Sequence, residues 1–449
     1  MGAILCGLAA ITTYFAVGRS ARFGLIIVFL WGFLYGILRA NYLDSFAHFI
    51  FDASLIAFYC AYGWKLTPDE RKRLRTLRTW LVVLIGWALL IAIIPFQHPL
   101  VTLVGLRGNI FFLPLILVGA RLKTKDLLIF AGGVAVLNLL AIGFGSAEYV
   151  LGVKRFFPFN AVTQIIYNSN DVAGYQYLRI PSTFVTAHAY GGAMVATLPF
   201  LFGAWAHPGA GRIQKLLFVS GMVAALVGVL MSSTRVNFLY AALVALAAIL
   251  TANIRAGNRV LLIIGLVIVG IVASGNQRLS RFKSLGNGEV VTDRLSGSVN
   301  RTFWQIAQEY PMGNGLGGGG TSIPFFLANL VKRPVGMESE YARIMLEQGI
   351  PGLLLWGVFF GWLLTSSRAF ERGPFRSGRI LAWVSFCFSC VAAAVGTGLM
   401  TSIPQTPFLL LCMGWIAVRQ RQVPDDLEEL RRESSEETRA VSSEALLAF

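Results

Sequence analysis

The chain has 449 residues, of which 56% are hydrophobic and only 13% are charged, against about 25% charged in an ordinary soluble domain. So few charges cannot cover the surface of a water-soluble protein of this size, and apolar runs of membrane-spanning length recur as far as about Val418, so the sequence predicts a polytopic membrane protein. The net charge of +16 lies mostly in short connectors between apolar segments, a pattern that orients membrane helices and excludes a nucleic-acid-binding protein.

Thirteen apolar runs are predicted to be helical spans, although several are short for a bilayer core that takes about 20 helical residues. We therefore expect an all-α polytopic membrane protein with about 12–13 transmembrane helices, formed by residues 1–423. The runs begin near Gly2, Phe23, Ser45, Thr79, Gly105, Asp126, Phe184, Gln214, Val236, Val260, Tyr341, Ile380 and Gln405.

Every second connector is rich in Lys and Arg, and this alternation predicts the orientation of the helices. The positive-inside rule places the basic set in the cytoplasm. An odd number of spans then puts the N-terminus outside and the C-terminus inside. Residues 424–449 form an acidic tail, which we expect to be cytoplasmic and dispensable for chemistry. The basic connectors lie at Arg19 and Arg22, Lys65 to Arg78, Arg121 to Lys125, Arg212 and Lys215, Arg255 and Arg259, Arg368 to Arg379, and Arg419 and Arg421.

Two long loops are predicted on the outer side, at about residues 146–183 and 275–340. The second loop is too long for a simple connector, and such loops are usually functional or disordered. Its aromatic and apolar content predicts that it packs onto the membrane domain; these residues are Phe282, Phe303, Trp304, Tyr310, Phe325, Phe326 and Leu330.

Three arginines in or beside these outer regions are candidate ligand-binding residues: Arg179, Arg235 and Arg301. Arg235 closes a turn between two apolar runs, where a guanidinium either binds an anion or snorkels to the membrane surface; the sequence leaves both interpretations open. Arginine is suited to bidentate phosphate binding. Arg179 and Arg301 are each followed, after eleven intervening residues, by a glycine, Gly191 and Gly313 respectively.

A glycine-rich segment at residues 311–320 contains Gly313 and Gly315 but no following Gly-Lys-Ser/Thr, so it is not a nucleotide P-loop. A flexible hinge is the simpler interpretation. An anion-binding nest of backbone amides is the alternative.

Carboxylates cluster where the second outer loop meets the next span. Glu340 is favoured there by a helix dipole, and Arg343 and Glu347 have the i, i+4 spacing of an ion pair. Glu338 has no such local explanation, so it is the candidate general base or hydroxyl clamp. His188 is interpreted as a buried hydrogen-bonding residue, with catalysis as the alternative. No metal constellation is recognised, since a metal would have to use Glu338 and Glu340 alone.

The five cysteines all fall in apolar stretches. Cys387 and Cys390 form a C-x-x-C inside a predicted membrane helix, where small buried hydrophobes are favoured over a redox or metal pair.

Four segments together resemble the O-antigen ligase and polymerase superfamily of bacterial inner-membrane glycosyltransferases. They occur in the order typical of that family, between spans and around one dominant periplasmic loop. Arg107 also looks like the arginine that opens an early helix of the family. The segments are 179–199 (RIPSTFVTAHAYGGAMVATLP), 232–236 (SSTRV), 310–319 (YPMGNGLGGG) and 338–353 (ESEYARIMLEQGIPGL).

One departure from the family pattern favours its polymerase branch: the ligase branch carries a His-Asn pair where this chain has Glu338 and Ser339. Two further departures concern spacing and a turn. In the polymerase branch ten residues separate an arginine from a glycine in both loops, whereas eleven separate them here, and Val236 stands where the family often has glycine.

The resemblance implies a polymerase that joins oligosaccharide repeat units carried on undecaprenyl pyrophosphate, at the periplasmic face of the inner membrane, to make exopolysaccharide, capsule or O-antigen. It implies catalytic roles for Glu338, Arg179 and Arg235, and substrate contacts by the residues named at the end of this paragraph. No cofactor and no metal are expected; the partners are the glycan donor and acceptor, the bilayer, and a chain-length regulator and flippase. Two alternatives are an O-antigen ligase acting on lipid A core or protein, and a polysaccharide flippase or other transporter. The substrate-contact candidates are Arg301, Arg107, His188, Glu340, Gly313 and Gly315.

Overall fold

A computed structural model describes residues 1–168, 178–251, 301–320, 323–337, 339–396 and 398–419. These residues form helices and connecting loops, and the described ranges contain no strand. Eight of their helices are long and apolar enough to cross a membrane. The chain is therefore an all-helical multi-pass membrane protein. The long helices are α1 (Gly2–Arg19), α2 (Ala21–Asn41), α5 (Arg75–Ile93), α6 and α7 counted together (Pro99–Arg121), α8 (Thr124–Leu151), α10 (Ala187–Ala206), α11 (Arg212–Ser232) and α16 (Glu340–Ser366).

Shorter helices complete the bundle and its loops. The apolar ones are α3 (Ile50–Ala61, preceded by the 3-10 turn η1, Ser45–Phe49), α12 (Arg235–Thr251), α17 (Arg376–Ala392) and α18 (Gln405–Ala417). Within the Pro99–Arg121 segment, α6 ends at Ile110 and α7 begins at Pro114. The loop elements are α4 (Pro68–Arg73), η2 (Val153–Arg155), α9 (Gln164–Asn168), α15 (Arg301–Glu309) and η5 (Phe325–Leu330).

Twelve of the thirteen predicted spans coincide with these helices, and the span predicted near Val260 lies outside the described residues. Two predicted boundaries are wrong. The span placed near Gly105 begins at Pro99, which fits the first helical turn because its missing N–H has no partner to lose there. The first outer loop begins after Leu151 rather than near Ser146, because α8 continues through its small residues until Gly152 adopts φ 86°.

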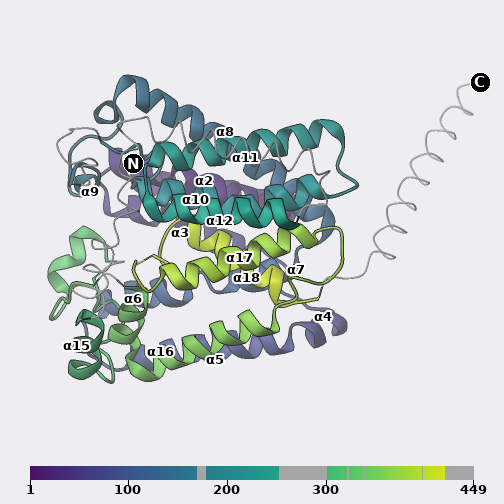
Figure 1. The fold of residues 1–449 in the computed structure, drawn as a ribbon. Helices are drawn as coiled ribbons and strands as arrows, with labels where there is room; N and C mark the ends of the chain where they lie inside the picture. Colours follow the sequence, from purple (N-terminus) through teal and green to yellow (C-terminus); the bar gives the residue numbers. More distant parts are fainter. Residues whose placement is uncertain (169–177, 252–300, 321–322, 338, 397, 420–449) are drawn as a thin grey trace, which may run out of the picture.

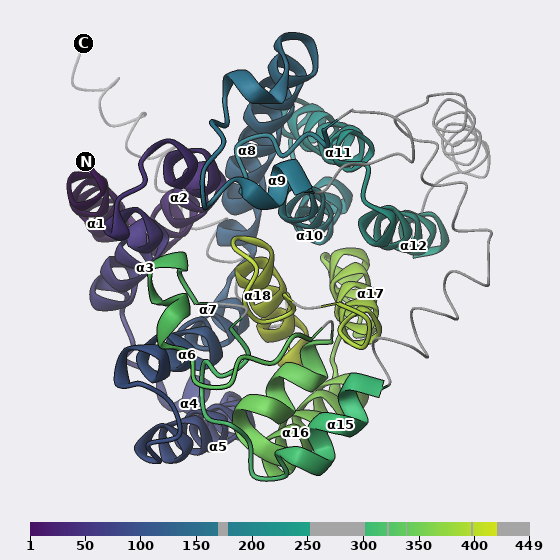
Figure 2. The same ribbon diagram turned by 90° about the vertical axis from the view of Figure 1, so that its left-hand side faces the viewer.

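The helices pack around α10, whose membrane-length window is 83% buried, the highest share among the candidate spans. Seen from one end of the bundle, α10, α17 and α18 lie at the centre and the remaining helices surround them (Figure 2). The core beside α10 is aromatic: Phe408 of α18 stacks on Phe29 of α2 at 3.9 Å between ring centroids, and Phe200 of α10 stacks on Trp415 at 5.5 Å.

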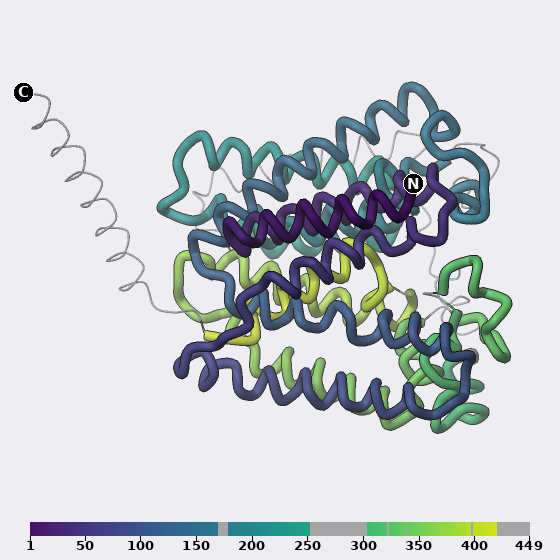
Figure 3. Tube along the Cα trace, turned by 180° about the vertical axis from the view of Figure 1, so that it is seen from behind, coloured from purple at the N-terminus to yellow at the C-terminus, as the bar shows by residue number. Residues whose placement is uncertain are grey.

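The bundle has two distinct ends. The N-terminus, α9 and α15 lie at one end, and α4 lies at the other, as Figures 1 and 3 show from opposite sides. We call these the loop end and the α4 end. The described chain finishes at the α4 end, where the Arg73 guanidinium donates a hydrogen bond to the carbonyl of Arg419. The two predicted outer loops thus share an end, and the predicted basic connector at residues 65–78 lies at the opposite one.

Candidate functional site

At the loop end, the segment that carries Arg179 is fixed against two helices. The amide of Ile37 on α2 donates a hydrogen bond to the carbonyl of Thr183 at 2.8 Å. Gly36 lies so close to the backbone of Phe184 that any side chain on Gly36 would collide with it. The segment therefore reaches α10 along the end of α2, and Arg179 lies half-buried at its start.

Ser182 secures the same segment to α8. Its φ of 52° is in the left-handed region, which a non-glycine residue rarely occupies without strong local contacts. Those contacts come from α8: the Ser182 amide donates to Glu148 Oε2 at 2.8 Å, and its hydroxyl donates to the Ala141 carbonyl at 2.7 Å. Glu148 is 1% exposed. A buried carboxylate thus positions the Arg179 segment.

The turn before Arg235 is built from small polar residues and packs against the start of α10. Ser233 closes α11 with φ 50°, and Thr234 precedes α12. The Asn237 amide group donates to the Thr234 hydroxyl at 2.9 Å and to the carbonyl of His188 at 2.8 Å. The structure therefore brings Arg235 and His188, 47 residues apart in sequence, into one polar region.

His188 does not fit its prediction as a buried hydrogen-bonding residue. The side chain is exposed at the start of α10, and it is the backbone carbonyl of His188 that Asn237 contacts.

The glycine-rich segment forms a packed turn, which contradicts its interpretation as a flexible hinge. Residues 314–319 are buried. Gly313, Gly315 and Gly317 have φ values of 87°, 85° and 81°, a conformation open to glycine at little cost. The Gln97 side chain donates to the Asn314 carbonyl at 2.8 Å, and the Asn314 amide donates to the Leu346 carbonyl on α16. The turn is held between α6 and α16.

Beneath this turn, Arg343 joins a fully buried ionic network. Arg343, Glu340 and Glu347 are all 0% exposed. The guanidinium donates to Glu340 Oε1 at 2.7 Å and to Glu347 Oε2 at 2.6 Å. Asn109 of α6 donates to the same Glu347 oxygen at 2.7 Å, and Gln348 donates to the Asn109 side-chain carbonyl at 2.8 Å. The predicted Arg343–Glu347 pair is thus part of a larger structure.

Glu340 makes a contact beyond its own helix, in addition to its predicted interaction with the dipole of α16. Its second oxygen accepts the amide of Gly398 at 2.7 Å, so this carboxylate ties α16 to the connection between α17 and α18. Two carboxylates and one guanidinium leave the network with a formal charge of −1. Glu347 Oε1 has no partner within the described structure and lies beside Gly319 of the glycine-rich turn.

Arg107, predicted as a substrate contact, is already engaged by a protein carboxylate. It lies in the last turn of α6. Its Nε lies 2.9 Å from both oxygens of Asp52, and Nη2 lies 2.8 Å from Oδ2. Asp52 is 5% exposed. This bidentate pair joins α6 to α3, so the guanidinium has a structural partner that the sequence spacing did not indicate.

Two predicted site residues have no described side chain. Glu338 lies outside the described residues, and Arg301 opens α15 with its side chain outside them. Within the described part of the chain, no three His, Cys, Asp or Glu side chains gather to form a metal site. Cys387 and Cys390 are free thiols, half-buried in α17.

Sequence reasoning missed several polar residues that build this end of the bundle. They share one signal, which is a polar or ionisable side chain in or beside an apolar run, where burying it costs free energy unless it has a partner. Because the partners lie far away in the sequence, this signal identifies the residue but not its contact. These residues are Asp52, Gln97, Asn109, Glu148 and Asn237.

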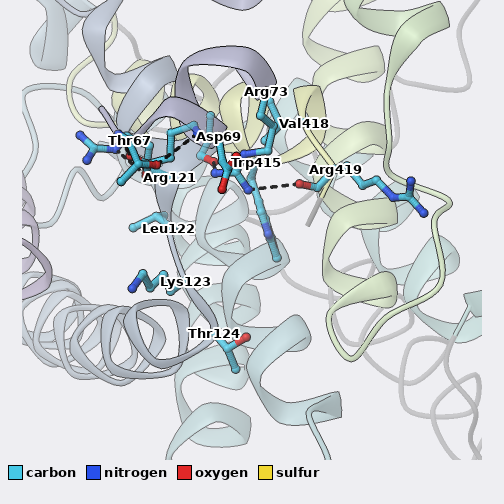
Figure 4. Close-up of a pocket in the computed structure, with 12 residues that line it drawn as sticks. Thr67, Asp69, Arg73, Arg121, Leu122, Lys123, Thr124, Trp415, Val418 and Arg419 are labelled. Atoms are coloured by element: carbon cyan, nitrogen blue, oxygen red, sulfur yellow. Dashed lines mark hydrogen bonds and ion pairs between the residues drawn. The ribbon is translucent and has the colours of Figure 1, made fainter. Parts of the chain in front are cut away.

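A pocket at the α4 end is separate from these groups. Figure 4 shows its lining, in which Arg73 contacts the carbonyl of Arg419. Arg121 pairs with Glu70 at 3.4 Å between Nε and Oε1. Partial burial raises the pKa of Glu70, but the Thr67 amide and the Arg121 guanidinium outweigh it and hold this pKa below its ordinary value. The pocket is lined by Thr67, Asp69, Glu70, Arg73, Ala120, Arg121, Leu122, Lys123, Thr124, Trp415, Val418 and Arg419.

The chain matches no family model and no curated protein. Its functional interpretation therefore rests on its own residues. The segments that carry the family resemblance lie in two polar groups at the loop end: residues 178–191 with 232–237, and residues 310–319 with 340–349 and Arg107. The two groups flank the central helices α10, α17 and α18 (Figure 2).

Proposed function

We propose that this chain is an inner-membrane polymerase that joins oligosaccharide repeat units carried on undecaprenyl pyrophosphate, at the periplasmic face. One observation carries the proposal. Four separated segments that resemble the O-antigen ligase and polymerase superfamily lie at one end of the helical bundle in two polar groups, and one of these groups carries half-buried Arg179 and Arg235. The segments are far apart in the sequence, so only the fold brings them to one end of the bundle. A catalytic site built from all four segments requires this.

In the proposed reaction, a hydroxyl of the acceptor sugar attacks the anomeric carbon of the donor. A new glycosidic bond forms as the bond to the pyrophosphate oxygen breaks, and undecaprenyl pyrophosphate leaves with the bonding electron pair. Arg179 and Arg235, joined by Arg301, are assigned to the charge that develops on this leaving group, since preorganised cations act there most strongly. Glu338 is assigned to orient the hydroxyl and accept its proton.

The proposed site requires a rigid frame, and the described contacts supply one. Glu148 and Ser182 hold the Arg179 segment, and Asn237 holds the Arg235 turn to α10. Asn314 holds the glycine-rich turn to α16, and the Arg343 network holds the start of α16, which follows Glu338 in the sequence. Arginines on positioned segments lose less freedom when they bind a phosphate than arginines on free loops do.

The proposal is tested with purified full-length protein and lipid-linked repeat units as the only glycan substrate. We expect ladders of longer glycan in the presence of EDTA. Arg179→Lys and Arg235→Lys should lose nearly as much activity as the alanine variants, because lysine lacks the bidentate fork. Arg155→Lys is the matched control, since Arg155 is an exposed arginine of the same end. Full activity of both lysine variants would overturn the assigned roles.

Glu338 is tested by Glu338→Gln, which keeps the shape of the side chain and removes its charge. Product should fall at least tenfold, equivalent to about 1.4 kcal/mol of barrier. Glu309→Gln is the control, since Glu309 is an exposed glutamate of the second loop. If no product forms until lipid A core is added, the protein is a ligase and the polymerase proposal is wrong.

The proposed orientation has its own test. Reporter fusions after Arg73, Lys123 and Arg376 should read cytoplasmic, and fusions at Asn168 and Asn287 should read periplasmic. A cytoplasmic reading at Asn168 would overturn the periplasmic site, because Asn168 ends α9 at the loop end of the bundle.

A further inference from the structure

Arg39, in the last turn of α2 at the loop end, is a half-buried arginine that forms no ion pair with any described carboxylate. Its Nη1 lies 3.5 Å from the hydroxyl of Tyr35, and its guanidinium lies over the Tyr35 ring at 5.7 Å. Its Nε is buried and has no hydrogen-bond partner. The guanidinium is thus held in place by an aromatic residue while part of its donor capacity remains unused.

His48 in η1 is the second unsatisfied group of the same cluster. It is 5% exposed, and its Nε2 is buried without a partner. Tyr35 links it to Arg39, because the Tyr35 hydroxyl also donates to the His48 carbonyl at 3.1 Å. The imidazole contacts two rings from the second outer loop, Phe325 and Phe326, at 5.5 and 5.3 Å between centroids. The cluster therefore joins α2, η1 and η5.

The nearby Arg107–Asp52 pair does not neutralise this cluster. Both oxygens of Asp52 already accept from Arg107, so the pair is balanced internally. Arg39 remains as an excess positive charge. The dipole of α2 favours a cation at that helix end by about 0.3–1 kcal/mol. Leaving a buried donor unpaired costs about 1–3 kcal/mol for each group, so the dipole alone does not account for this arrangement.

We propose that Arg39 and His48 form a binding site for a phosphate-bearing lipid headgroup. A phosphoryl group supplies several acceptor oxygens and negative charge in one place. Guanidinium has the planar fork that matches those oxygens, and a neutral imidazole donates one further hydrogen bond. Lipid chains fit the surroundings, because α1 packs against η1 through Cys6 and Phe46, and the same N-terminal turns of α1 expose the apolar side chains of Ile4 and Leu8.

The position of the site relates it to the Arg179 segment. Ile37, two residues before Arg39, pairs with Thr183 of that segment. Two sources supply the same phosphoryl chemistry, namely a polyprenyl carrier and an anionic phospholipid. The site is inferred from the unpaired donors of Arg39 and His48, and only its assignment to a carrier lipid rests on the proposed function.

Binding is measured with full-length protein in neutral detergent, using native mass spectrometry and titration. The probes are undecaprenyl phosphate and phosphatidylglycerol, each paired with its phosphate-free counterpart, undecaprenol or diacylglycerol. All variants are made in an Arg179→Gln, Arg235→Gln background, so that the arginines assigned to the reaction contribute no binding. Arg39→Gln should weaken binding of at least one phosphate lipid tenfold or more, and His48→Phe, which keeps the aromatic contacts, about threefold or more. Arg155→Gln should leave binding unchanged.

Thermal unfolding separates binding from a structural role. Arg39→Met keeps the apolar stem and removes the unpaired donor, so its melting temperature should equal or exceed that of the parent protein while phosphate-lipid binding is lost. Equal binding by the parent, Arg39→Gln and His48→Phe would overturn the site, as would equal binding of the phosphate-free probes. A response to undecaprenyl phosphate identifies a carrier, and a response to phosphatidylglycerol alone identifies a phospholipid. Arg39-dependent binding in a protein that makes no polymer would keep the site and reject the proposed function.

Discussion

Arg343 and Arg39 are two arginines at the same end of one bundle with opposite surroundings. Arg343 is fully buried, and two carboxylates and an amide accept its hydrogen bonds. Arg39 is half-buried and contacts only the Tyr35 hydroxyl and ring, while its Nε has no partner. Both guanidiniums lie at the loop end of the bundle, so location alone does not distinguish them.

The partners distinguish them, and they imply different roles. A buried charge that is fully matched by protein groups holds the structure together and has no capacity left for a ligand. A partly buried charge without a counterion costs stability, and a ligand that supplies the missing acceptors removes that cost. By this criterion Arg343 is a structural residue, and Arg39 is available for binding.

The largest expected effect is the loss of Arg343. Arg343→Gln leaves Glu340 and Glu347 buried without a cation, which should destabilise the protein by about 3–5 kcal/mol. The measurement is thermal or denaturant unfolding in detergent, with the exposed Arg155→Gln as control. A melting temperature equal to that of the parent would show that the network is not the structural element described here.

A smaller loss is expected at Gly349, where α16 bends above the glycine-rich turn. Gly349 has φ 73°, and a Cβ there would lie 2.8 Å from the Met312 carbonyl carbon. Gly349→Ala should therefore cost about 1–3 kcal/mol through strain and displacement of the turn. Gly357→Ala is the matched control on the same helix, since nothing lies within 4 Å of a Cβ at that position and alanine should stabilise the helix there. Equal stability of the two variants would contradict the packed turn.

Arg107 sharpens the comparison because it is paired but less deeply buried than Arg343. A double-mutant cycle of Arg107→Met and Asp52→Leu should give a coupling energy of about 1–3 kcal/mol in unfolding measurements, as expected for a close bidentate pair. A substrate contact would instead show unchanged stability and a loss of activity in Arg107→Met alone. That second result would restore the role that the sequence predicted.

The sequence predicts the helices well because membrane spans are recognised by composition and length alone. Apolar runs located α1, α8 and α11 within a few residues, and errors arose where small residues were interpreted as breakers, as before Leu151 in α8. The i, i+4 spacing likewise predicted the Arg343–Glu347 pair. Local rules suffice where the interaction is local.

The remaining site residues were not predictable, because their partners lie far away in the chain. Arg107 and Asp52 are separated by 55 positions, and Asn109 and Glu347 by 238. No periodicity relates such positions. The sequence did not single out Arg39, because its significance depends on the absence of a carboxylate among the described residues around it. The lack of a carboxylate near Arg39 is visible only in the packed structure.

The smallest effect is expected at the α4 end, where Glu70 is a half-buried carboxylate, in contrast to the fully buried ones of the Arg343 network. Its pKa is held below the ordinary value of about 4.3 by the Thr67 amide and Arg121, which outweigh the opposing effect of burial. A carboxyl group with a lowered pKa in the folded state stabilises that state above its unfolded pKa, and this contribution is lost as the pH falls through the folded pKa. Because the pair is partly exposed, the contribution should be less than about 1 kcal/mol.

Hydrogen exchange of the α4 amides measures this contribution locally. Protection of Arg71–Arg73 should fall between pH 6 and pH 3.5 in the parent protein, and Glu70→Gln should show reduced protection at pH 6 with little further change on acidification. Asp69→Asn is the control, since the neighbouring Asp69 is exposed and makes none of the capping contacts of Glu70. An identical pH response in the parent and Glu70→Gln would place the acid sensitivity elsewhere.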